Sequence, residues 1–254
     1  MIIPILQGGL GNQMFQISTA YSLARDNNDE VAINYNIQHI GLQKSQLYYK
    51  DNIFKKIKST DVFPAFKYNE PFFNFKQIPY DNNMCIHGYF QSEKYFEKYK
   101  KEINTIFEFP KSVKDKVDNF LGKFKNVYKV GIHYRRGDYI QYKNIYNCLG
   151  EDYYKKAKKI ISKKKLVYLN CSDDFNNVLN EFAVEGEIIK FGSELEDLYM
   201  LSQCDSIIMS NSSFSWWGSW LGKNKDVIVM PKNWFGPGGE KHYEDIYIKE
   251  SLII

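Results

Sequence analysis

Short apolar runs and segments of helical periodicity alternate along the first half of the chain. The run IIPIL at 2–6 predicts a strand, and the glycine-rich sequence at 8–12 predicts the turn that closes it. The runs VAIN at 31–34 and CIHGYF at 85–90 predict two further strands. A helix after the turn is indicated by residues that share one face, namely Met14, Ile17, Tyr21 and Ala24. We expect 41–80 to be irregular or weakly helical and 91–126 to be a polar segment.

The second half alternates more regularly. Apolar strand runs lie at 127–134, 166–170, 187–191, 206–210 and 227–230. Helical segments at 151–162, 174–183 and 194–204, with another beginning at Phe214, separate these runs. Short apolar strands that alternate with helices predict a parallel sheet covered on both faces. We therefore predict an α/β fold with two domains, 1–125 and 126–254.

Composition narrows the classes of protein that this chain could represent. A hydrophobic content of 44% excludes a disordered chain, and a net charge of +4 is far from that of a nucleic-acid binder. The four cysteines, Cys85, Cys148, Cys171 and Cys204, are too scattered for a disulfide framework or a zinc site. No run approaches the roughly 18 apolar residues of a membrane span, and the N-terminus lacks the features of a signal peptide. The expected location is the cytoplasm.

The segment SNSSFSWWGSWL at 210–221 joins a strand to a helix. At the carboxyl end of a parallel strand, Asn211, Ser212 and Ser213 could cap the helix or bind an anion such as phosphate. Trp216 and Trp220 are four residues apart and can pack the helix onto the sheet. A cap followed by core tryptophans, with no ligand, explains the pattern equally well.

The segment HYRRGDY at 133–139 also leaves the end of a predicted strand. Strand alternation places His133 and Arg135 on one face and Arg136 on the other. Arg135 is our candidate for a pyrophosphate clamp, because a guanidinium can hold phosphate oxygens in a bidentate manner. Arg136 is expected in a structural pair, with Asp138 as a possible partner. A wholly structural set of ion pairs is the alternative.

Three further features bear on a nucleotide ligand. In CSDD at 171–174, Asp173 or Asp174 could accept two hydrogen bonds from a guanine, or could cap the following helix. The sequence GGLGNQ at 8–13 lacks the third glycine of a dinucleotide-binding motif, so its glycines are expected to allow close approach to a sugar or phosphate. No Asp-x-Asp is present to hold a divalent metal.

The lysine-rich stretch 155–165 is interpreted as a solvated helix face, with an anionic-lipid contact as the alternative.

Taken together, five segments resemble those of the bacterial α-1,2-fucosyltransferase family, glycosyltransferase family 11. They are GGLGNQMFQ, HGYFQSEKYF, HYRRGDY, CSDD and SNSSFSWWGSWL, and they follow the family's order through both halves of the chain. The resemblance implies a GT-B architecture, in which two Rossmann-like domains with parallel sheets face a cleft. It implies an N-terminal acceptor-side domain and a C-terminal domain that binds GDP-fucose. The implied reaction is inverting, metal-independent transfer of fucose to a hydroxyl, typically of galactose in a glycan of a surface polysaccharide such as O-antigen.

The resemblance also implies roles for individual residues. It places Arg135 at the β-phosphate, His133 near the guanosine and Asp173 at the guanine. It assigns the phosphates and their surroundings to Asn211, Ser212, Ser213 and Phe214, and the reacting sugar to Gly9, Gly11 and Asn12. The general base is left open, with Asp138 the nearest carboxylate in the sequence.

The implied partners are GDP-fucose and a galactose-containing glycan, with no cofactor, no metal and no nucleic acid. A peripheral contact with the inner face of the membrane, or with a lipid-linked glycan, stays open. So do three alternatives: transfer with another linkage, use of a different GDP-sugar, and a non-catalytic protein that binds glycan or nucleotide.

Overall fold

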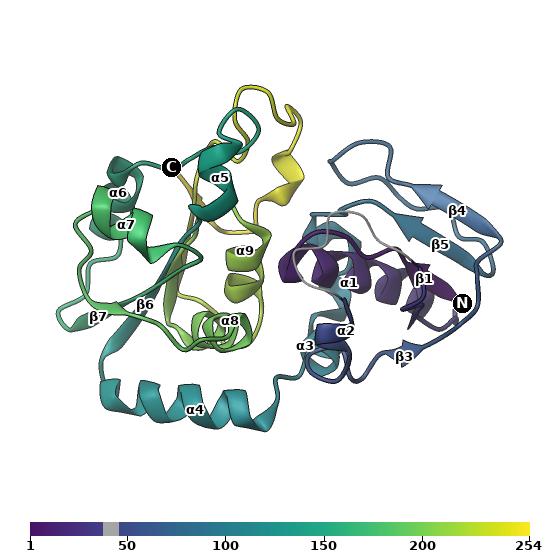
Figure 1. The fold of residues 1–254 in the computed structure, drawn as a ribbon, viewed down its shortest axis with the longest axis horizontal. Helices are drawn as coiled ribbons and strands as arrows, with labels where there is room; N and C mark the ends of the chain where they lie inside the picture. The colour runs from purple at the N-terminus through teal and green to yellow at the C-terminus, as the bar shows by residue number, and fades with distance from the viewer. Residues whose placement is uncertain (38–45) are drawn as a thin grey trace. The chain divides into compact units, whose positions relative to one another are not determined.

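The computed structural model describes residues 1–37 and 46–254, which form two compact units (Figure 1). The first unit comprises Met1–Pro110 together with His242–Ile246. The second comprises Lys111–Lys241 and Tyr247–Ile254. The chain therefore passes between the units earlier than the boundary near 125 expected from the sequence.

Helix α4 (Lys111–Leu121) explains the position of this boundary. It packs on α8 (Glu194–Gln203) of the second unit, and the Lys116 ammonium lies 2.8 Å from a carboxylate oxygen of Glu196. The face of α4 that becomes buried consists of Val113, Val117 and Leu121. This spacing of three and four residues is that of an amphipathic helix within a segment expected only to be polar.

Five short parallel strands form the sheet of the first unit. Strand β1 pairs with β5, β5 with β4, and β2 with β3, while a parallel bridge between Ile2 and Val31 joins the two groups. The order across the unit is thus β3-β2-β1-β5-β4. The strands are β1 (Ile2–Pro4), β2 (Ala32–Ile33), β3 (Lys58–Ser59), β4 (Phe66–Asn69) and β5 (Met84–His87). The helices are α1 (Leu10–Asp26), α2 (Gln46–Lys50), α3 (Lys100–Ile106), and the 3₁₀ turns η1 (Glu93–Tyr95), η2 (Glu97–Tyr99) and η4 (Glu244–Ile246).

The expectation of irregular structure over 41–80 was wrong for the two strands β3 and β4. Both lie on outer positions of the sheet, and the side chains of β3 and most of those of β4 are exposed. They therefore lack the apolar pattern that marks a buried strand. Residues 41–45 of that segment lie outside the described residues.

The second unit holds a six-stranded, all-parallel sheet in the order β11-β10-β9-β6-β7-β8. Counted from β6, this is the doubly wound order in which the first and fourth strands are neighbours. The strands are β6 (Tyr128–Tyr134), β7 (Leu166–Ser172), β8 (Glu187–Ile188), β9 (Ser206–Ile208), β10 (Val227–Met230) and β11 (Leu252–Ile253). The helices are α4, η3 (Gly122–Phe124), α5 (Gly137–Gln141), α6 (Glu151–Ile160), α7 (Phe175–Glu181), α8 and α9 (Ser213–Trp220).

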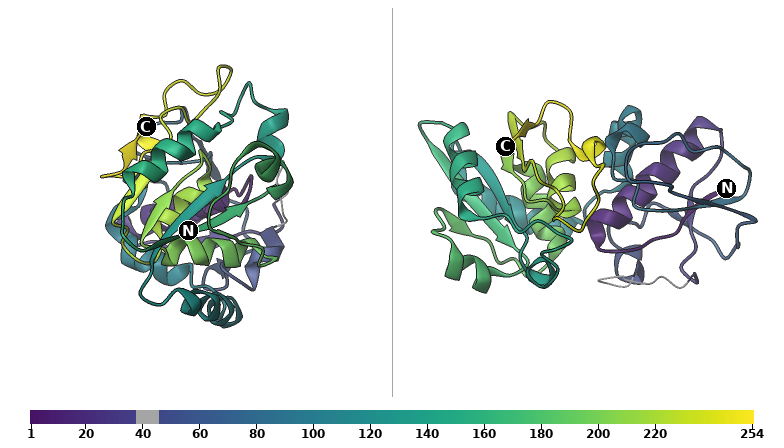
Figure 2. Two further views of the ribbon diagram at one scale, coloured as in Figure 1. Left: turned by 90° about the vertical axis from the view of Figure 1, so that its left-hand side faces the viewer. Right: turned by 90° about the horizontal axis from the view of Figure 1, so that it is seen from above.

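Helices cover both faces of this sheet, as the alternation of strands and helices predicts (Figure 2). Val130 and Ile132 of β6 belong to a buried cluster with residues of α6 and α7. Gly131, between them, faces the other way, and a Cβ added there would meet Leu201 of α8. The two faces of β6 are therefore distinct, and they continue into the residues that follow the strand.

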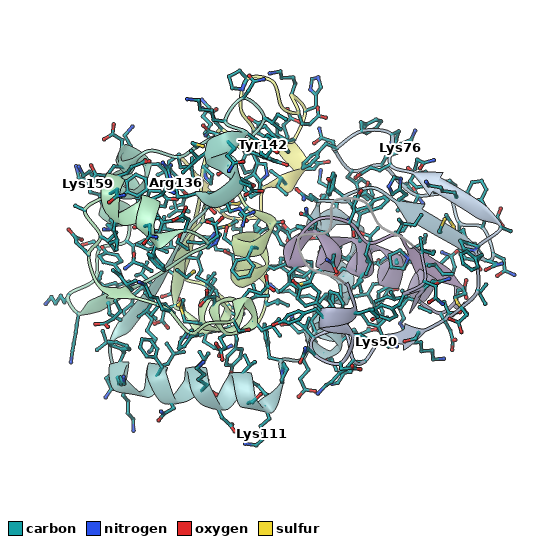
Figure 3. The ribbon with its side chains drawn as sticks, in the orientation of Figure 1. Lys50, Lys76, Lys111, Arg136, Tyr142 and Lys159 are labelled. Carbon is teal, nitrogen blue, oxygen red and sulfur yellow. The ribbon has the colours of Figure 1, made fainter. Side chains whose placement is uncertain are left out.

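Helix α6 carries most of the lysine-rich stretch on its solvent face. Lys155, Lys156 and Lys159 are exposed, and Lys159 extends outward from the helix (Figure 3). Ile160 is also 40% exposed. Among the described residues, no helix is long and apolar enough to cross a membrane.

Candidate active site

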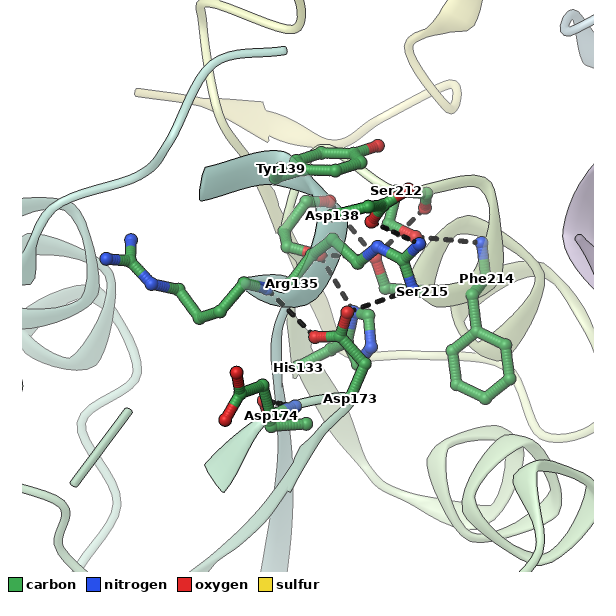
Figure 4. A network of polar contacts seen from close by, with 12 residues as sticks. His133, Arg135, Asp138, Tyr139, Asp173, Asp174, Ser212, Phe214 and Ser215 are labelled. Atoms are coloured by element: carbon green, nitrogen blue, oxygen red, sulfur yellow. Dashed lines mark hydrogen bonds and ion pairs between the residues drawn. The ribbon is translucent and has the colours of Figure 1, made fainter. Parts of the chain in front are cut away.

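The carboxyl ends of β6 and β9 meet at the point where the strand order of the second sheet reverses. Ligands of doubly wound folds bind at this point. His133, near the end of β6, lies 2.8 Å through Nδ1 from the Ser210 hydroxyl that follows β9. Its ring centroid is 5.2 Å from that of Phe214. The segments HYRRGDY and SNSSFSWWGSWL are thus in direct contact (Figure 4).

His133 is held as a neutral imidazole. The side chain is buried, and burial together with the nearby charge of Arg135 lowers its pKa to about 3. A neutral ring keeps one nitrogen as an acceptor and the other as a donor. His133 can therefore donate or accept a hydrogen bond at neutral pH, but it does not add a positive charge to the site.

Arg135 is fixed in place by two carboxylates and an aromatic ring. One terminal nitrogen lies 2.7 Å from Asp138, the other lies 3.2 Å from Asp173, and the guanidinium carbon is 5.2 Å from the centre of the Tyr139 ring. The buried Nε has no hydrogen-bond partner in the described part of the chain. The side chain keeps 16% exposure, so the oriented guanidinium retains donors for a further anion.

Arg136 takes the opposite face of the sheet. Its guanidinium pairs with Glu181 of α7, donates to the Leu149 carbonyl at 3.2 Å and lies 5.2 Å from the centre of the Phe182 ring. The predicted division of the two arginines between faces is confirmed. The suggested partner was wrong, because Asp138 pairs with Arg135.

The two aspartates after β7 have different partners. Asp174 is the N-cap of α7 and accepts from the Asn177 amide at 3.1 Å, a hydrogen bond that lowers the pKa of Asp174. Asp173 accepts from the Arg136 backbone amide at 2.8 Å as well as pairing with Arg135. Helix capping therefore accounts for Asp174 and does not account for Asp173.

The turn before α9 is held by its own side chains. Ser212 is the N-cap, and its hydroxyl accepts from the Phe214 amide at 3.3 Å. Asn211 donates both amide hydrogens to backbone carbonyls, those of Asn147 at 2.8 Å and Trp234 at 2.7 Å. These bonds give Asn211 a structural role in positioning the turn. Ser213 is half-buried at the first position of the helix.

Behind the turn, three tryptophans anchor α9 in the core. Trp216 and Trp217 have no exposed surface, and Trp216 stacks on Trp220 with ring centroids 6.0 Å apart. The predicted packing of this helix through Trp216 and Trp220 is confirmed. The rings hold the helix in place while its N-terminal amides lie at the carboxyl edge of the sheet.

In the first unit, the glycine-rich turn follows β1. The strand order of the first unit also reverses there, between β1 and β5. Gly9 is the N-cap of α1 and Gly11 is buried in its first turn. Asn12 accepts from the Gln91 side chain at 2.7 Å, which ties the turn to the loop after β5. Gln13 donates to the Gly8 carbonyl at 3.1 Å. Gln91 supports this edge and was not identified from the sequence.

Glu70, after β4, was also missed. Its carboxylate accepts from the backbone amides of Tyr89 at 2.6 Å and Phe90 at 2.9 Å. Burial raises the pKa of Glu70 to about 7 against the opposing effect of these two hydrogen bonds. No pattern in the surrounding sequence marks it, because its role depends on the pairing of β4 with β5.

Among the described residues, no group of three or more His, Cys, Asp or Glu side chains could hold a metal ion. The charged groups at the edge of the second sheet are instead Arg135 and the carboxylates that orient it.

Solved structures with similar architecture define the fold class. A TM-score of 0.53 relates the chain to the fucosyltransferase NodZ from Bradyrhizobium, at 14% identity over 87% of this chain and 92% of that one. A TM-score of 0.52 relates it to a mutant of FUT1 from Arabidopsis thaliana in complex with GDP, at 13% identity over 92% and 71%. The fold is that of the GT-B glycosyltransferases, as predicted.

The family is narrower than this class. The chain belongs to glycosyl transferase family 11, whose family model matches residues 1–253. An O-antigen biosynthesis glycosyltransferase, WbnK, and an alpha-1,2-colitosyltransferase, both from Escherichia coli, are each 28% identical to it. The matches cover 91% of this chain and 93% of WbnK, and 92% of this chain and 92% of the colitosyltransferase. A galactoside alpha-(1,2)-fucosyltransferase 2 from Sus scrofa is 23% identical over 87% of this chain and 70% of its own length.

Proposed function

We propose that this glycosyltransferase moves L-fucose from GDP-fucose to the 2-hydroxyl of a galactose in a glycan, with inversion and without a metal. The observation that carries the proposal is the arrangement of Arg135. Its guanidinium is oriented by Asp138 and Asp173 at the carboxyl edge of the second sheet, and the side chain keeps 16% exposure. An anion held there would lie where doubly wound folds bind nucleotides.

We assign the donor contacts as follows, and the position of each group supports the assignment. Arg135 binds the β-phosphate, and the N-terminus of α9 with Ser212 and Ser213 receives the remaining phosphate charge. His133 lies beside the guanosine as a neutral partner. Asp173 accepts hydrogen bonds from the guanine through lone pairs that its two arginine contacts leave open.

The reaction is a single displacement at the anomeric carbon of fucose. The acceptor oxygen forms a bond to that carbon as the bond to the β-phosphate oxygen breaks, and the electron pair leaves with GDP. Arg135 stabilises the negative charge that builds on the phosphate. The acceptor hydroxyl passes its proton to a carboxylate, for which Asp138 is our candidate, and Asn12 orients the acceptor.

One related protein favours a second candidate donor. The alpha-1,2-colitosyltransferase is as similar to this chain as WbnK is. Colitose is L-fucose without its 3-hydroxyl, so the same phosphate and guanine contacts would serve GDP-colitose. A protein that hydrogen-bonds the 3-hydroxyl would prefer fucose, because loss of that group leaves a polar site unpaired.

The test uses purified protein with GDP-fucose or GDP-colitose and a set of β-galactosides. We expect GDP release that depends on the acceptor, and a product with an α-1,2 linkage. Faster turnover of GDP-colitose would favour the second candidate. GDP binding without transfer or hydrolysis would indicate a non-catalytic protein and overturn the proposal. The names of the relatives point to surface-polysaccharide acceptors, so lipid-linked glycans belong in the acceptor set.

A further inference from the structure

Glu70 has no part in the roles assigned above, although both of its carboxylate oxygens are engaged. Oε2 accepts from the Tyr89 amide at 2.6 Å, and Oε1 accepts from the Phe90 amide at 2.9 Å. The Glu70 amide donates in turn to the His87 carbonyl at 2.8 Å, which continues the pairing of β4 with β5 (Figure 1). The end of β4 therefore holds the backbone that leaves β5.

The backbone held by Glu70 has an unfavourable conformation. Phe90 has a φ of 51°, in the left-handed region that a bulky aromatic residue rarely occupies. Its ring is fully buried and packs edge-on against Tyr95, with ring centroids 5.6 Å apart. A residue keeps such a conformation only where its surroundings fix it. The two hydrogen bonds from Glu70 to consecutive amides do so directly at this residue.

Gly88 gives the carboxylate room to reach these amides. A Cβ added at Gly88 would collide with the Glu70 Cβ and would lie 2.6 Å from Oε2. A side chain at position 88 would therefore displace the Glu70 carboxylate from the amides that it binds. Gly88 and Glu70 together fix the path of the chain over 88–90.

This path leads directly to Gln91. The Ser92 amide donates to the Phe90 carbonyl at 2.8 Å, which closes a three-residue turn with Gln91 at its centre. The Gln91 side chain is 8% exposed, and its Nε2 donates to Oδ1 of Asn12 at 2.7 Å. One buried side-chain amide thus joins the loop after β5 to the first turn of α1.

The contact with Gln91 fixes which way the Asn12 amide faces. A side-chain amide carries an acceptor oxygen and an NH₂ group with two donor hydrogens. Because Gln91 donates to the oxygen of Asn12, the NH₂ group is turned away from Gln91. Asn12 is thereby set to offer a donor, and not an acceptor, to a substrate oxygen.

We propose that Glu70 is a positioning residue for the transfer reaction, which acts through Gln91 on Asn12. The carboxylate fixes the backbone at 88–90, this backbone places Gln91, and Gln91 turns the Asn12 amide toward donation. The proposal rests on the proposed function, because it takes from it the role of Asn12 in orienting the acceptor. Loss of the Glu70 contacts should impair transfer to an acceptor and leave the reaction of the donor with water intact.

The experiment measures two rates for each variant, transfer of fucose to a β-galactoside and hydrolysis of GDP-fucose without an acceptor. For Glu70→Gln, kcat/KM for the acceptor should fall about tenfold, on the order of one lost hydrogen bond. Hydrolysis and GDP affinity should stay at wild-type values, whereas a general loss of structure would lower both rates together. Gly88→Ala should give the same ratio of rates, because its Cβ displaces the carboxylate while Glu70 is still present.

Asp29→Asn is the matched control. The Asp29 carboxylate also accepts from a backbone amide of the first unit, that of Glu30 at 2.7 Å, but it pairs with the N-terminal ammonium at the amino edge of the sheet. Asp29→Asn should keep the wild-type ratio of transfer to hydrolysis, even where it lowers the melting temperature.

A double variant tests whether Glu70 acts through Gln91. Gln91→Ala removes the contact with Asn12 directly and should slow transfer at least as much as Glu70→Gln. The double variant should transfer no more slowly than Gln91→Ala alone, because both substitutions break the same series of contacts. Effects that multiply would show that Glu70 acts by another route and would overturn the proposal.

Hydrogen exchange and NMR test the structural part without any substrate, and so separate this proposal from the proposed function. The amides of Tyr89 and Phe90 should exchange slowly in the wild type and in Asp29→Asn, and faster in Glu70→Gln. The signals of the Gln91 side-chain amide should move in the same direction in Glu70→Gln as in Asn12→Ala. If the wild type transfers no fucose, these signals still decide whether Glu70 holds Gln91 on Asn12. An unchanged Gln91 signal in Glu70→Gln, or transfer and hydrolysis that fall together, overturns the proposal.

Discussion

Arg135 and Arg136 carry the same charge on consecutive residues, and the alternation of β6 sends them into different surroundings. Arg135 meets two carboxylates at the edge of the sheet and keeps a buried nitrogen without a partner among the described residues. Arg136 meets Glu181, a backbone carbonyl and an aromatic ring. Two arginines next to each other in the sequence therefore have different surroundings, and substitution of Arg135 and of Arg136 should have different effects.

Arg135→Ala should lower kcat by about 10²–10³, because in the proposed reaction Arg135 stabilises the charge that develops as GDP leaves. Arg135→Lys should also be poor, since a point charge cannot reproduce the planar fork. Arg136→Ala should retain most of kcat but lose about 1–3 kcal/mol of unfolding free energy, because the Leu149 carbonyl loses its donor. Steady-state kinetics and thermal melting of the three variants test this. A near-normal kcat for Arg135→Ala would contradict the proposal that Arg135 stabilises the departing GDP.

The adjacent aspartates offer a second contrast. Asp173→Asn should weaken GDP binding by tenfold or more, on the order of one lost charge-assisted contact, because it removes an acceptor and loosens Arg135. Asp174→Ala should instead cost about 1 kcal/mol of stability through loss of the α7 cap, with GDP affinity unchanged. GDP titration and chemical denaturation of both variants distinguish the roles. Reversal of the two outcomes would show that the guanine contact was assigned to the wrong residue.

His133 should contribute to the pH dependence of stability. Its pKa is about 3 in the folded chain and 6.5 for the free side chain. Between these values the unfolded chain binds a proton that the folded chain does not, so stability falls as pH decreases below 6.5. The full slope is about 1.4 kcal/mol per pH unit. Denaturation of wild type and His133→Asn at several pH values should show a shallower slope for the variant.

Glu70 should contribute to the pH dependence of stability with the opposite sign, and it serves as the comparison for His133. Its pKa is raised to about 7, so the folded chain binds a proton between 4.5 and 7 that the unfolded chain does not. Its contribution to stability is present below pH 4.5 and is lost as pH rises through 7. Glu70→Gln should therefore steepen the slope that His133→Asn reduces. Equal slopes in wild type and both variants would refute both assignments.

At the scale of elements, burial decides which strands the sequence reveals. Strand β6 is buried along most of its length, and its boundary was predicted to within a residue. Strand β8 is exposed and is shorter than the predicted run at 187–191. Strands β3 and β4 form through pairing with neighbouring strands and carry no buried apolar pattern of their own. The sequence therefore did not predict them.

Helix α9 depends on close packing against α8. A Cβ added at Gly218 would lie 2.7 Å from the Leu201 Cβ, and neither atom can rotate away. Gly218→Ala should therefore cost about 1–3 kcal/mol and weaken GDP binding, because the N-terminus of α9 moves with the helix. Gly122→Ala, with nothing within 4 Å of the added carbon, is the control. Melting and GDP titration should change only for Gly218→Ala.

At the scale of the whole molecule, the sequence identified the residues at strand ends and missed those that support them. His133 lies near the end of β6, Arg135 follows β6, and Ser212 comes after β9; the doubly wound order brings these two strand ends together. The contacts of Asn211 with Asn147 and Trp234 come from loops that no periodic pattern marks. The same holds for Gln91 and Glu70, whose roles exist only once β5 lies between β1 and β4.

We propose that the positive charge at the donor site comes from the chain itself and not from a metal ion. The sequence has no Asp-x-Asp, and in the proposed function Arg135 and the N-terminus of α9 supply the positive charge that faces the diphosphate. Fucose transfer should therefore proceed at full rate in excess EDTA, and Mg²⁺ or Mn²⁺ should add nothing beyond their effect on ionic strength. The measurement is initial rate against EDTA and against each metal, with ionic strength held constant by KCl. A strict metal requirement would mean that Arg135 and the helix cannot balance the diphosphate alone, and the leaving-group role assigned here would then have to be shared with an ion.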